Sequence, residues 1–427
     1  MRAITAVAAA AAAAAIAACG SSGPASTPST APPATTAPPA QAPDQTPGSA
    51  SPSAQSPAQQ ARALQGPAAA PTSTQLAALR AQRSVISRLS PEQLAGQRVI
   101  YSFNGRTAPA SLLTLIRHGD VGGVIFFSFN ISSQSQLTAM ISQFVKANAA
   151  PTNPARAYPL LLMTDQEGGQ VKRLPWAGPQ QSEAQIGASA DPAAAASAAG
   201  SQAAKGLRAV GMNVNLAPVL DVFRAAGDFD DQFQRSYSMN PKVVSAAGAA
   251  FVTAQQRGGV AATIKHFPGL GAAATREDTD NEPVTISLSA ATLRSVDEYP
   301  YRAAVRAGAK LAMVSWATYP ALGSRLPAAL SPSIVASELR GRVGFSGVTI
   351  TDALGAGALG AYGTLQNKTM LAGRAGMDAL LCTAIKPLPG WKCVDGLKAG
   401  YLDGALPKTA FQGQLAQLLA LRASLRS

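Results

Sequence analysis

Short apolar runs alternate with longer helical stretches along residues 98–425. Each run is about five residues long, which suits a buried β-strand. The intervening stretches are rich in alanine and place apolar residues at helical spacing, as in Ala108–His118, Ala194–Val210, Val243–Arg257 and Ala290–Ala307. The eight apolar runs are Arg98–Phe103, Gly123–Phe127, Leu160–Thr164, Asn213–Ala217, Val260–Ile264, Leu311–Ser315, Val348–Thr351 and Asp378–Cys382.

Eight strand candidates that alternate with helices predict a single α/β domain, a (β/α)8 barrel of the TIM type. Lys408–Leu425 would be its closing helix. Ser90 and Pro91 predict a helix start, because serine caps helices and proline suits the first helical position. An open, doubly wound parallel sheet is the alternative. We assign residues 72–427 to the barrel.

Polar and charged residues gather where the apolar runs end, whereas the other ends carry mostly glycine and small residues. Asp165 and Glu167 follow the third run, Asp221 the fourth, Lys265 and His266 the fifth, Trp316 the sixth and Asp352 the seventh. Functional residues of such barrels lie at the C-terminal ends of the strands. The sequence therefore predicts a polar cleft on that face of the barrel.

Residues 1–71 have a different composition. Residues 1–19 combine Arg2, an apolar run and small residues before Cys19, which is the pattern of a bacterial lipoprotein signal. We therefore expect cleavage before Cys19 and lipid on its thiol; an ordinary secretory signal with a chance cysteine is the alternative. Residues 20–71 are rich in Ala, Pro, Ser, Thr and Gln, which predicts a disordered tether because such a segment cannot bury a core.

The charge balance is basic but dispersed. The formal net charge is +13, from 35 Lys and Arg and 22 Asp and Glu, and only 13% of residues are charged. The basic residues form no patch interleaved with aromatic residues, so we expect no nucleic-acid partner. Solubility, or weak attraction to an anionic cell surface, is the interpretation that we favour.

Histidine and cysteine are too few for a zinc site built from several of them, and we expect no metal or cofactor. One of the two histidines, His118, precedes Gly119 at a predicted helix end, where a cation is favourable, so we interpret it as structural. Cys382 and Cys393 are eleven residues apart in a chain with an export signal, which predicts a disulfide between them.

Several side chains at the strand ends could do chemistry. Asp352 is a candidate nucleophile or electrostatic base or, alternatively, a cap of the next helix. Asp165 and Arg173 flank two glycines that let the backbone approach a ligand, and Arg173 offers a planar fork of donors; a structural salt-bridge loop is the alternative. Arg235 could add another cation. The loop after His266 carries four carboxylates, Glu277, Asp278, Asp280 and Glu282.

No Gly-x-Ser-x-Gly elbow and no phosphate-binding Gly-Lys-Ser/Thr loop occurs in the sequence. The remaining candidates are carboxylates and cations at the C-terminal ends of the predicted barrel strands. Two carboxyl groups that flank the scissile bond are the usual equipment of glycoside hydrolysis, so the sequence favours that chemistry.

The sequence motifs resemble glycoside hydrolase family 3, and within it the single-barrel β-N-acetylglucosaminidases. The resemblance spans Leu89 to Ile385. It rests on six segments in the right order, namely 122–127 (GGVIFF), 165–173 (DQEGGQVKR), 215–222 (NLAPVLDV), 235–237 (RSY), 265–269 (KHFPG) and 351–354 (TDAL).

This resemblance implies a retaining enzyme that removes terminal β-linked N-acetylglucosamine. In the family, the carboxylate that matches Asp352 attacks the anomeric carbon. The residues that match Asp165, Arg173, Arg235, Lys265 and His266 hold the terminal sugar.

The chain departs from the family pattern at the acid/base. Family members carry an Asp-Ser-His group whose histidine is the acid/base, whereas this loop reads Asp278-Thr279-Asp280 and is about two residues longer. The preceding His-Gly of the pattern is Leu270-Gly271 here. Only 75 residues follow Asp352, so we expect the acid to come from this loop, with Asp280 as the acid/base oriented or tuned by Asp278.

Two alternatives to this function stay open. One is a pseudoenzyme that binds cell-wall sugars without a working acid, and the other is a β-glucosidase of the same family. We expect a monomer, lipid-anchored outside the cytoplasmic membrane, that acts on β-N-acetylglucosaminide oligosaccharides or muropeptides.

Overall fold

The computed structural model describes residues 73–384 and 386–425. The predicted lipoprotein signal, with Cys19, and the predicted tether both lie outside these residues. Among the helices that are described, none combines the length and the apolar character that crossing a bilayer would require.

Eight parallel strands form one sheet in the order β10-β1-β2-β3-β6-β7-β8-β9. Ile350 on β9 forms a parallel bridge with Ala379, just before β10, so the sheet closes on itself. The predicted (β/α)8 barrel is confirmed and the open sheet is not. The strands are β1 (Val99–Tyr101), β2 (Gly123–Ile125), β3 (Leu161–Thr164), β6 (Val214–Asn215), β7 (Ala261–Phe267), β8 (Leu311–Val314), β9 (Val348–Thr351) and β10 (Leu380–Cys382).

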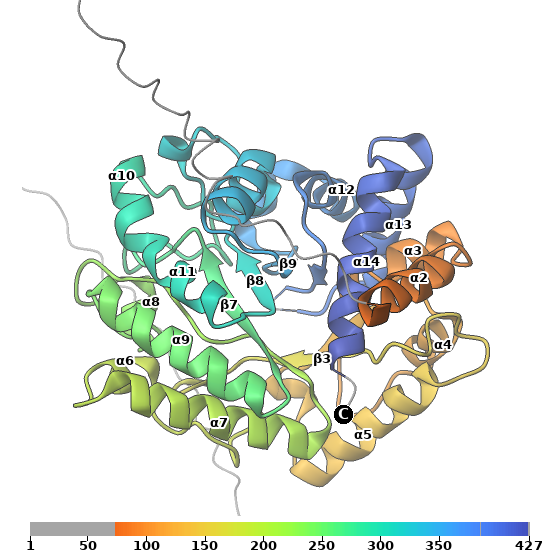
Figure 1. Cartoon of the computed structure of the whole chain (residues 1–427), viewed down its shortest axis with the longest axis horizontal. Coiled ribbons are helices and arrows are strands. Elements are labelled where there is room, and N and C mark those ends of the chain that lie inside the picture. The colour runs from red at the N-terminus through yellow and green to blue at the C-terminus, as the bar shows by residue number, and fades with distance from the viewer. Residues whose placement is uncertain (1–72, 385, 426–427) are drawn as a thin grey trace, which may run out of the picture. The chain divides into compact units, whose positions relative to one another are not determined.

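Helices surround the barrel (Figure 1). They are α2 (Ser73–Ile86), α3 (Pro91–Gly96), α4 (Ala110–His118), α5 (Gln134–Asn148), α6 (Glu183–Gly187), α7 (Pro192–Val210), α8 (Phe229–Gln232), α9 (Pro241–Arg257), α10 (Ala290–Thr292), α11 (Tyr299–Arg306), α12 (Leu365–Ala375), α13 (Gly390–Asp403) and α14 (Lys408–Ser424). Further helical segments, with 3₁₀ or π hydrogen bonding, are η1 (Ser128–Asn130), η2 (Leu293–Asp297), η3 (Pro320–Leu322), η4 (Ala328–Leu330), η5 (Ile334–Arg342) and η6 (Gly357–Tyr362).

Local sequence explains most helix ends. The side chain of Ser90 accepts a hydrogen bond from the backbone N–H of Gln93, whose side chain accepts one from the N–H of Ser90, so the predicted cap is present as a capping box. Gly119 ends α4 in the left-handed conformation, with φ of 86°. The predicted helix 290–307 is instead broken by the π-turn η2. Pro300, in the first turn of α11, has no N–H to continue the helical ladder.

Apolar side chains fill the inside of the barrel in addition to the space between sheet and helices. The inner cluster includes Ile125, Met163, Leu311 and Ile350, and Leu418 of α14 packs against it from one end. Burying each such side chain stabilises the fold by roughly 1.5–3 kcal/mol. The barrel is thus a packed core, and ligands are left with the face at the carboxyl ends of the strands.

Four loop segments contribute most to that face. The hairpin of β4 (Gln166–Gly168) and β5 (Val171–Lys172) follows β3. The other three are residues 216–240, after β6, residues 268–289, after β7, and residues 352–364, after β9. Strand β7 runs further than predicted, so that Lys265 and His266 are its last residues before Phe267.

Candidate active site

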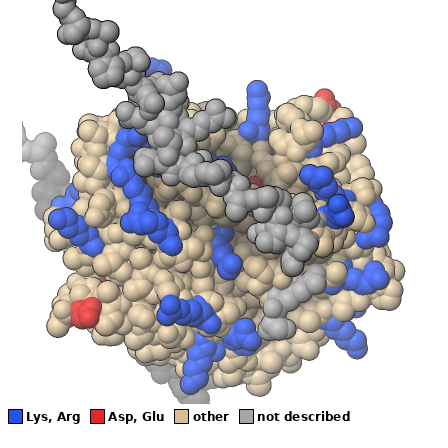
Figure 2. All heavy atoms as spheres, in the orientation of Figure 1, with Lys and Arg blue, Asp and Glu red and all other residues tan. Residues whose placement is uncertain are grey.

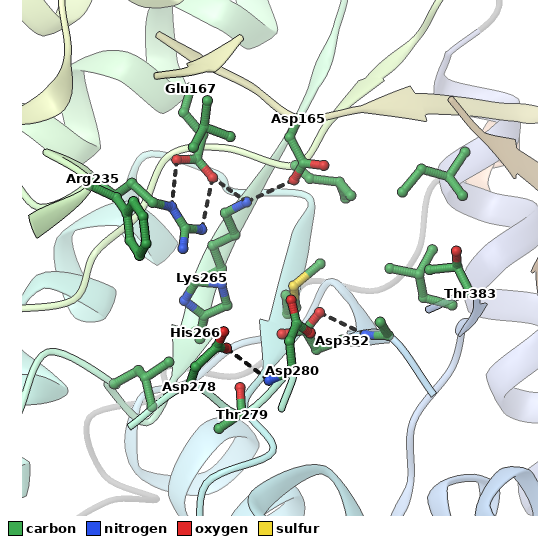
Figure 3. A pocket seen from close by; sticks show the side chains of 18 of the residues that line it. Asp165, Glu167, Arg235, Lys265, His266, Asp278, Thr279, Asp280, Asp352 and Thr383 are labelled. Carbon is green, nitrogen blue, oxygen red and sulfur yellow. Dashed lines mark hydrogen bonds and ion pairs between the residues drawn. The ribbon is translucent and has the colours of Figure 1, made fainter. Parts of the chain in front are cut away.

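A pocket of about 400 Å³ opens at the carboxyl ends of the strands (Figure 3). Side chains from β2, β3, β6, β7, β8, β9 and β10 and their following loops line it. The structure brings all eight predicted catalytic and sugar-binding residues into this pocket, namely Asp165, Arg173, Arg235, Lys265, His266, Asp278, Asp280 and Asp352.

One end of the pocket is a cluster of charges centred on Glu167. Its carboxylate accepts two hydrogen bonds from Arg235, at 2.9 and 3.0 Å, and lies 2.6 Å from the Nζ atom of Lys265. Lys265 also donates to Asp165 at 3.0 Å, so the ammonium group lies between two carboxylates (Figure 3). Arg173 lines the same pocket but forms no ion pair with any described residue.

These contacts keep a buried acid and a buried base ionised. Burial alone would raise the pKa of Glu167, but Arg235 and Lys265 lower it to about 2. Burial likewise opposes the charge of Lys265, and the neighbouring Glu167 and Asp165 nevertheless raise its pKa. The cluster therefore presents fixed donors of permanent charge at neutral pH, which suits recognition of sugar hydroxyl groups.

The position of His266 is fixed by hydrogen bonds to Asp221, which is fully buried. The Nδ1 atom of His266 lies 2.7 Å from a carboxylate oxygen of Asp221, and the backbone N–H of His266 donates to the same carboxylate. Asp221 also accepts a 2.6 Å hydrogen bond from the N–H of Leu270, near the start of the following loop. Burial would lower the pKa of His266, but the charge of Asp221 raises it.

Asp221, Asp230 and His266 place ligand atoms within 4.8 Å of one another, the one such group among the described residues. The oxygens of Asp221 already accept four N–H contacts, and Asp230 lies 3.1 Å from Arg235. Burial, followed by the charge of Asp221, raises the pKa of Asp230 to about 7. Asp221, Asp230 and His266 therefore belong to a hydrogen-bonded network next to the pocket.

Asp352 follows β9 and reaches the pocket half-buried. One of its oxygens accepts a 2.7 Å hydrogen bond from the N–H of Ala353, and the Nε1 atom of Trp316 donates to the carbonyl of Ala353 at 2.9 Å. The side chain that caps α12 is that of Thr364, not Asp352. Asp352 is therefore held by its own turn and stays directed at the pocket.

Asp280 lies in the loop after β7. Backbone hydrogen bonds join this loop to the loop after β9. The carboxylate of Asp278 accepts a 2.9 Å hydrogen bond from the N–H of Asp280. The carbonyl of Asp280 accepts one from Gly357 at 2.7 Å, and that of Thr279 accepts one from Ala358. A side chain at Gly357 would collide with the backbone of Asn281 at 2.0 Å, so this close approach requires glycine.

The surroundings of Asp280 favour its neutral form. Burial in the concave wall, followed by the charges of Asp352 and then Asp278, raises its pKa to about 7. The side chain remains exposed to the solvent in the pocket even though protein surrounds it on several sides. A carboxyl group of this kind can donate a proton near neutral pH, which an ordinary aspartate cannot do.

Sequence reasoning missed some residues of the pocket and its support. The sequence places Glu167 after the third run but does not predict its position between Arg235 and Lys265. Asp221 was noted only as the residue after a strand. Thr383 follows the eighth strand, and that position was a usable signal. Among the phenylalanines that line the pocket, Phe127 ends the second apolar run, whereas Phe229 and Phe233 carry no such signal in the sequence.

Cys382 and Cys393 are joined by a disulfide. It links the last residue of β10 to α13, and both cysteines are buried. Thr383, which follows Cys382 directly, lines the pocket. The bond therefore fixes one wall of the pocket to an outer helix.

Comparison with known proteins matches this geometry. The model of the glycosyl hydrolase family 3 N terminal domain matches residues 92–421. An "uncharacterized secreted glycosyl hydrolase" from Arthroderma benhamiae is 45% identical over 332 residues, 78% of this chain and 93% of that protein. A β-hexosaminidase from Stenotrophomonas maltophilia is 34% identical over 62% of this chain and 77% of that protein.

Among solved structures, a glycoside hydrolase family 3 β-N-acetylglucosaminidase from Paenibacillus sp. superposes with a TM-score of 0.73 at 30% identity. The match covers 79% of this chain but only 64% of the Paenibacillus chain, so this chain spans less than two thirds of that protein. With a family model that matches most of its length and a relative 45% identical, this chain is a glycosidase that belongs to glycosyl hydrolase family 3.

Proposed function

We propose that the protein is a retaining β-N-acetylglucosaminidase with Asp352 as nucleophile and Asp280 as acid/base. The observation that carries this proposal is the pairing of Asp280, whose pKa is raised, with Asp352 in one pocket. The charged cluster at the other end of the pocket supports it, because it offers donors to a sugar ring. Relatives named β-hexosaminidase and β-N-acetylglucosaminidase support the choice of an N-acetyl sugar.

In the first step, a carboxylate oxygen of Asp352 attacks the anomeric carbon. The bond to the leaving oxygen breaks, and the protonated carboxyl group of Asp280 donates its proton to that oxygen. The products are a free alcohol and a glycosyl ester of Asp352. In the second step, the carboxylate of Asp280 removes a proton from water, whose oxygen attacks the anomeric carbon and releases Asp352 as a carboxylate.

The charge of Asp352 lets Asp280 serve in both steps. While Asp352 is ionised, it helps to raise the pKa of Asp280, which keeps the acid protonated. Once Asp352 forms an ester, its charge disappears and this contribution to the pKa is lost. Asp280 then becomes a stronger acid and stays ionised as the base that the second step needs.

Five side chains would hold the terminal sugar, in agreement with the family resemblance. Lys265 and Arg235 are fixed in place by Glu167, and His266 is fixed by Asp221. Asp165 and Arg173 come from the segment after β3 and face the same space. A charged donor that is already held in position binds a sugar hydroxyl group more tightly than a mobile one does. The entropy cost of ordering its side chain has been met when the protein folded, not when the sugar binds.

We further propose that the substrates are glycans of the cell envelope, such as peptidoglycan-derived oligosaccharides or muropeptides. The sequence of residues 1–19 and the secreted relative support export, and we retain a lipid anchor at Cys19 and a monomeric state as parts of this proposal.

Hydrolysis of two aryl β-N-acetylglucosaminides tests the catalytic assignment, one with an activated leaving group and one with a poor one. Asp352→Asn should abolish turnover of both. Asp280→Asn should slow the poor substrate by roughly 10²–10⁴-fold more than the activated one, because only the poor leaving group needs a proton. Glu282→Gln is the matched control, since Glu282 is an exposed carboxylate of the same loop outside the pocket.

Three outcomes would contradict parts of the proposal. Equal slowing of both substrates by Asp280→Asn would remove Asp280 as the acid. Sugar binding without turnover in the unaltered protein would favour a pseudoenzyme. Equal hydrolysis of the corresponding β-glucosides would favour a glucosidase.

A further inference from the structure

The outer surface of the barrel is more basic than the net charge indicates. All Lys and Arg except Arg2, Arg62 and Arg426, and all Asp and Glu except Asp44, fall within the described residues, which leaves 32 basic and 21 acidic side chains. Three of the basic ones are buried and two others line the pocket, Arg173 and Arg235. Twenty-seven basic side chains therefore remain on the outside of the described barrel.

The acidic side chains are distributed differently, because most of them lie inside the protein or in the pocket. Eight are buried, four others line the pocket, and only nine of the 21 remain on the outer surface. Three of the buried ones, Asp297, Glu338 and Asp378, pair with outer arginines, so the basic excess of the outer surface is 15 rather than 18. The eight buried ones are Glu167, Glu183, Asp221, Asp230, Asp297, Glu298, Glu338 and Asp378. One face of the molecule shows many Lys and Arg and very few Asp and Glu (Figure 2).

The exposed cations are spread around the barrel and are mostly arginine. Eighteen basic side chains of the described residues are exposed, 13 of them arginine, against four acidic ones. Two of the four exposed acids, Asp280 and Glu282, are in the loop beside the pocket. Exposed cations occur on most of the outer helices, including Arg83 on α2, Lys146 on α5, Lys205 on α7, Arg257 on α9 and Arg374 on α12.

We propose that this outer surface binds a phosphate-bearing polyanion that surrounds the protein. Opposite charge is the complementary chemistry for such a surface, and the guanidinium fork of arginine matches phosphate oxygens. A planar anionic membrane would touch one side of the barrel only. Cations on helices all around the barrel instead fit a flexible chain or a mesh of chains.

The same charge distribution keeps the pocket accessible. Apart from Asp280, whose pKa is raised, the loop beside the pocket carries three carboxylates, Glu277, Asp278 and Glu282, against one exposed cation, Arg276, so a polyanion is repelled there and attracted elsewhere. Binding would then hold the enzyme within an anionic polymer without blocking the sugar site. This inference concerns the outer surface and does not depend on the catalytic roles of Asp280 and Asp352.

Binding of labelled long-chain inorganic polyphosphate, followed by fluorescence anisotropy, tests the proposal. The protein is the full chain with Cys19→Ala, so that no lipid contributes. We expect the logarithm of the dissociation constant to rise linearly with the logarithm of salt concentration, because bound phosphates release counterions. Polyphosphate should leave hydrolysis of a small aryl glycoside unchanged.

The matched variants carry three substitutions each, at exposed arginines remote from the pocket. Arg83→Gln, Arg257→Gln and Arg374→Gln together should reduce the salt slope by about one for each lost phosphate contact. The same three positions changed to lysine keep the charge and should keep the slope.

Four results would overturn the proposal. They are the absence of binding at low salt, binding that does not respond to salt, an unchanged slope in the glutamine variant, and tighter binding to anionic phospholipid vesicles than to polyphosphate at equal phosphate concentration. The last result would assign the surface to a membrane. Inhibition of aryl glycoside hydrolysis by polyphosphate would show that the acidic loop does not protect the pocket.

Discussion

Replacing Glu167 with glutamine should destabilise the fold by about 3 kcal/mol at pH 7. Glu167 is 1% exposed and lies against Arg235 and Lys265. Its pKa falls from 4.5 to about 2, and a tenfold change in an acid dissociation constant corresponds to about 1.36 kcal/mol, which together give this magnitude. Loss of one partner from a buried ion pair costs a similar amount, roughly 3–5 kcal/mol, because the remaining charges lack compensation.

The pH dependence of this loss follows from the lowered pKa. The folded-state pKa of Glu167 lies below the unfolded value, so its stabilisation is fully present above about pH 4.5. It is lost as the pH falls through the folded-state pKa of about 2. The difference between the unaltered protein and Glu167→Gln should therefore be constant from about pH 7 to about pH 5 and shrink towards about pH 2.

Urea unfolding of the two proteins at several pH values measures this difference, provided that the slope m is unchanged. Glu282→Gln, at an exposed carboxylate, should stay within about 0.5 kcal/mol of the unaltered protein. A difference below about 1 kcal/mol at pH 7, or one that does not shrink in acid, would refute the electrostatic role of Glu167. The variant should also have a raised KM, since Arg235 and Lys265 lose the contact that orients them.

Three further predictions concern the contacts around the pocket. The rate should fall above about pH 7, because Asp280 must be protonated in the first step, and Asp280→Asn should lack this basic limb in its pH–rate profile. Asp221→Asn should lower the pKa of His266, one of only two histidines, and an imidazole NMR titration that shows no change would count against the contact. Cys382→Ser should destabilise the protein by about 2–4 kcal/mol in thermal or urea unfolding, the usual value for a lost disulfide, whereas a cost below about 0.5 kcal/mol would show that the bond contributes nothing to stability.

The barrel could be predicted because its signals are local. Each apolar run such as Leu311–Ser315 needs only its own residues to indicate a strand, and the alternation of eight runs with helices leaves few folds. The break in the predicted helix 290–307 was missed for a physical reason. Alanine-rich helical spacing continues through Leu293–Asp297, and the interruption depends on Pro300 together with tertiary packing that the spacing does not record.

Many of the residues that line the pocket were also predictable, but the contacts between them were not. The rule that barrel strands end at the site was enough to gather Asp165, Lys265 and Asp352. The ion pair between Asp165 and Lys265 joins residues 100 positions apart, and Glu167 joins Lys265 to Arg235. Which carboxylate contacts which cation is decided by side-chain geometry, and a single sequence holds no record of that geometry.

The aspartate at position 280 is the chain's departure from the family pattern, and electrostatics decides whether it can work. At its ordinary pKa of 3.8, fewer than about one in a thousand such groups would carry a proton at pH 7, whereas at about 7 roughly half do. The environment of Asp280 therefore increases the acid form by nearly a thousandfold. A neutral acid must be sustained by negative neighbours or by burial; Asp352 and Asp278 supply the first, and the protein that surrounds Asp280 in the concave wall supplies the second. Removing the charge of Asp352 should for this reason lower the pKa of Asp280, which ties the identity of the acid to the presence of the nucleophile.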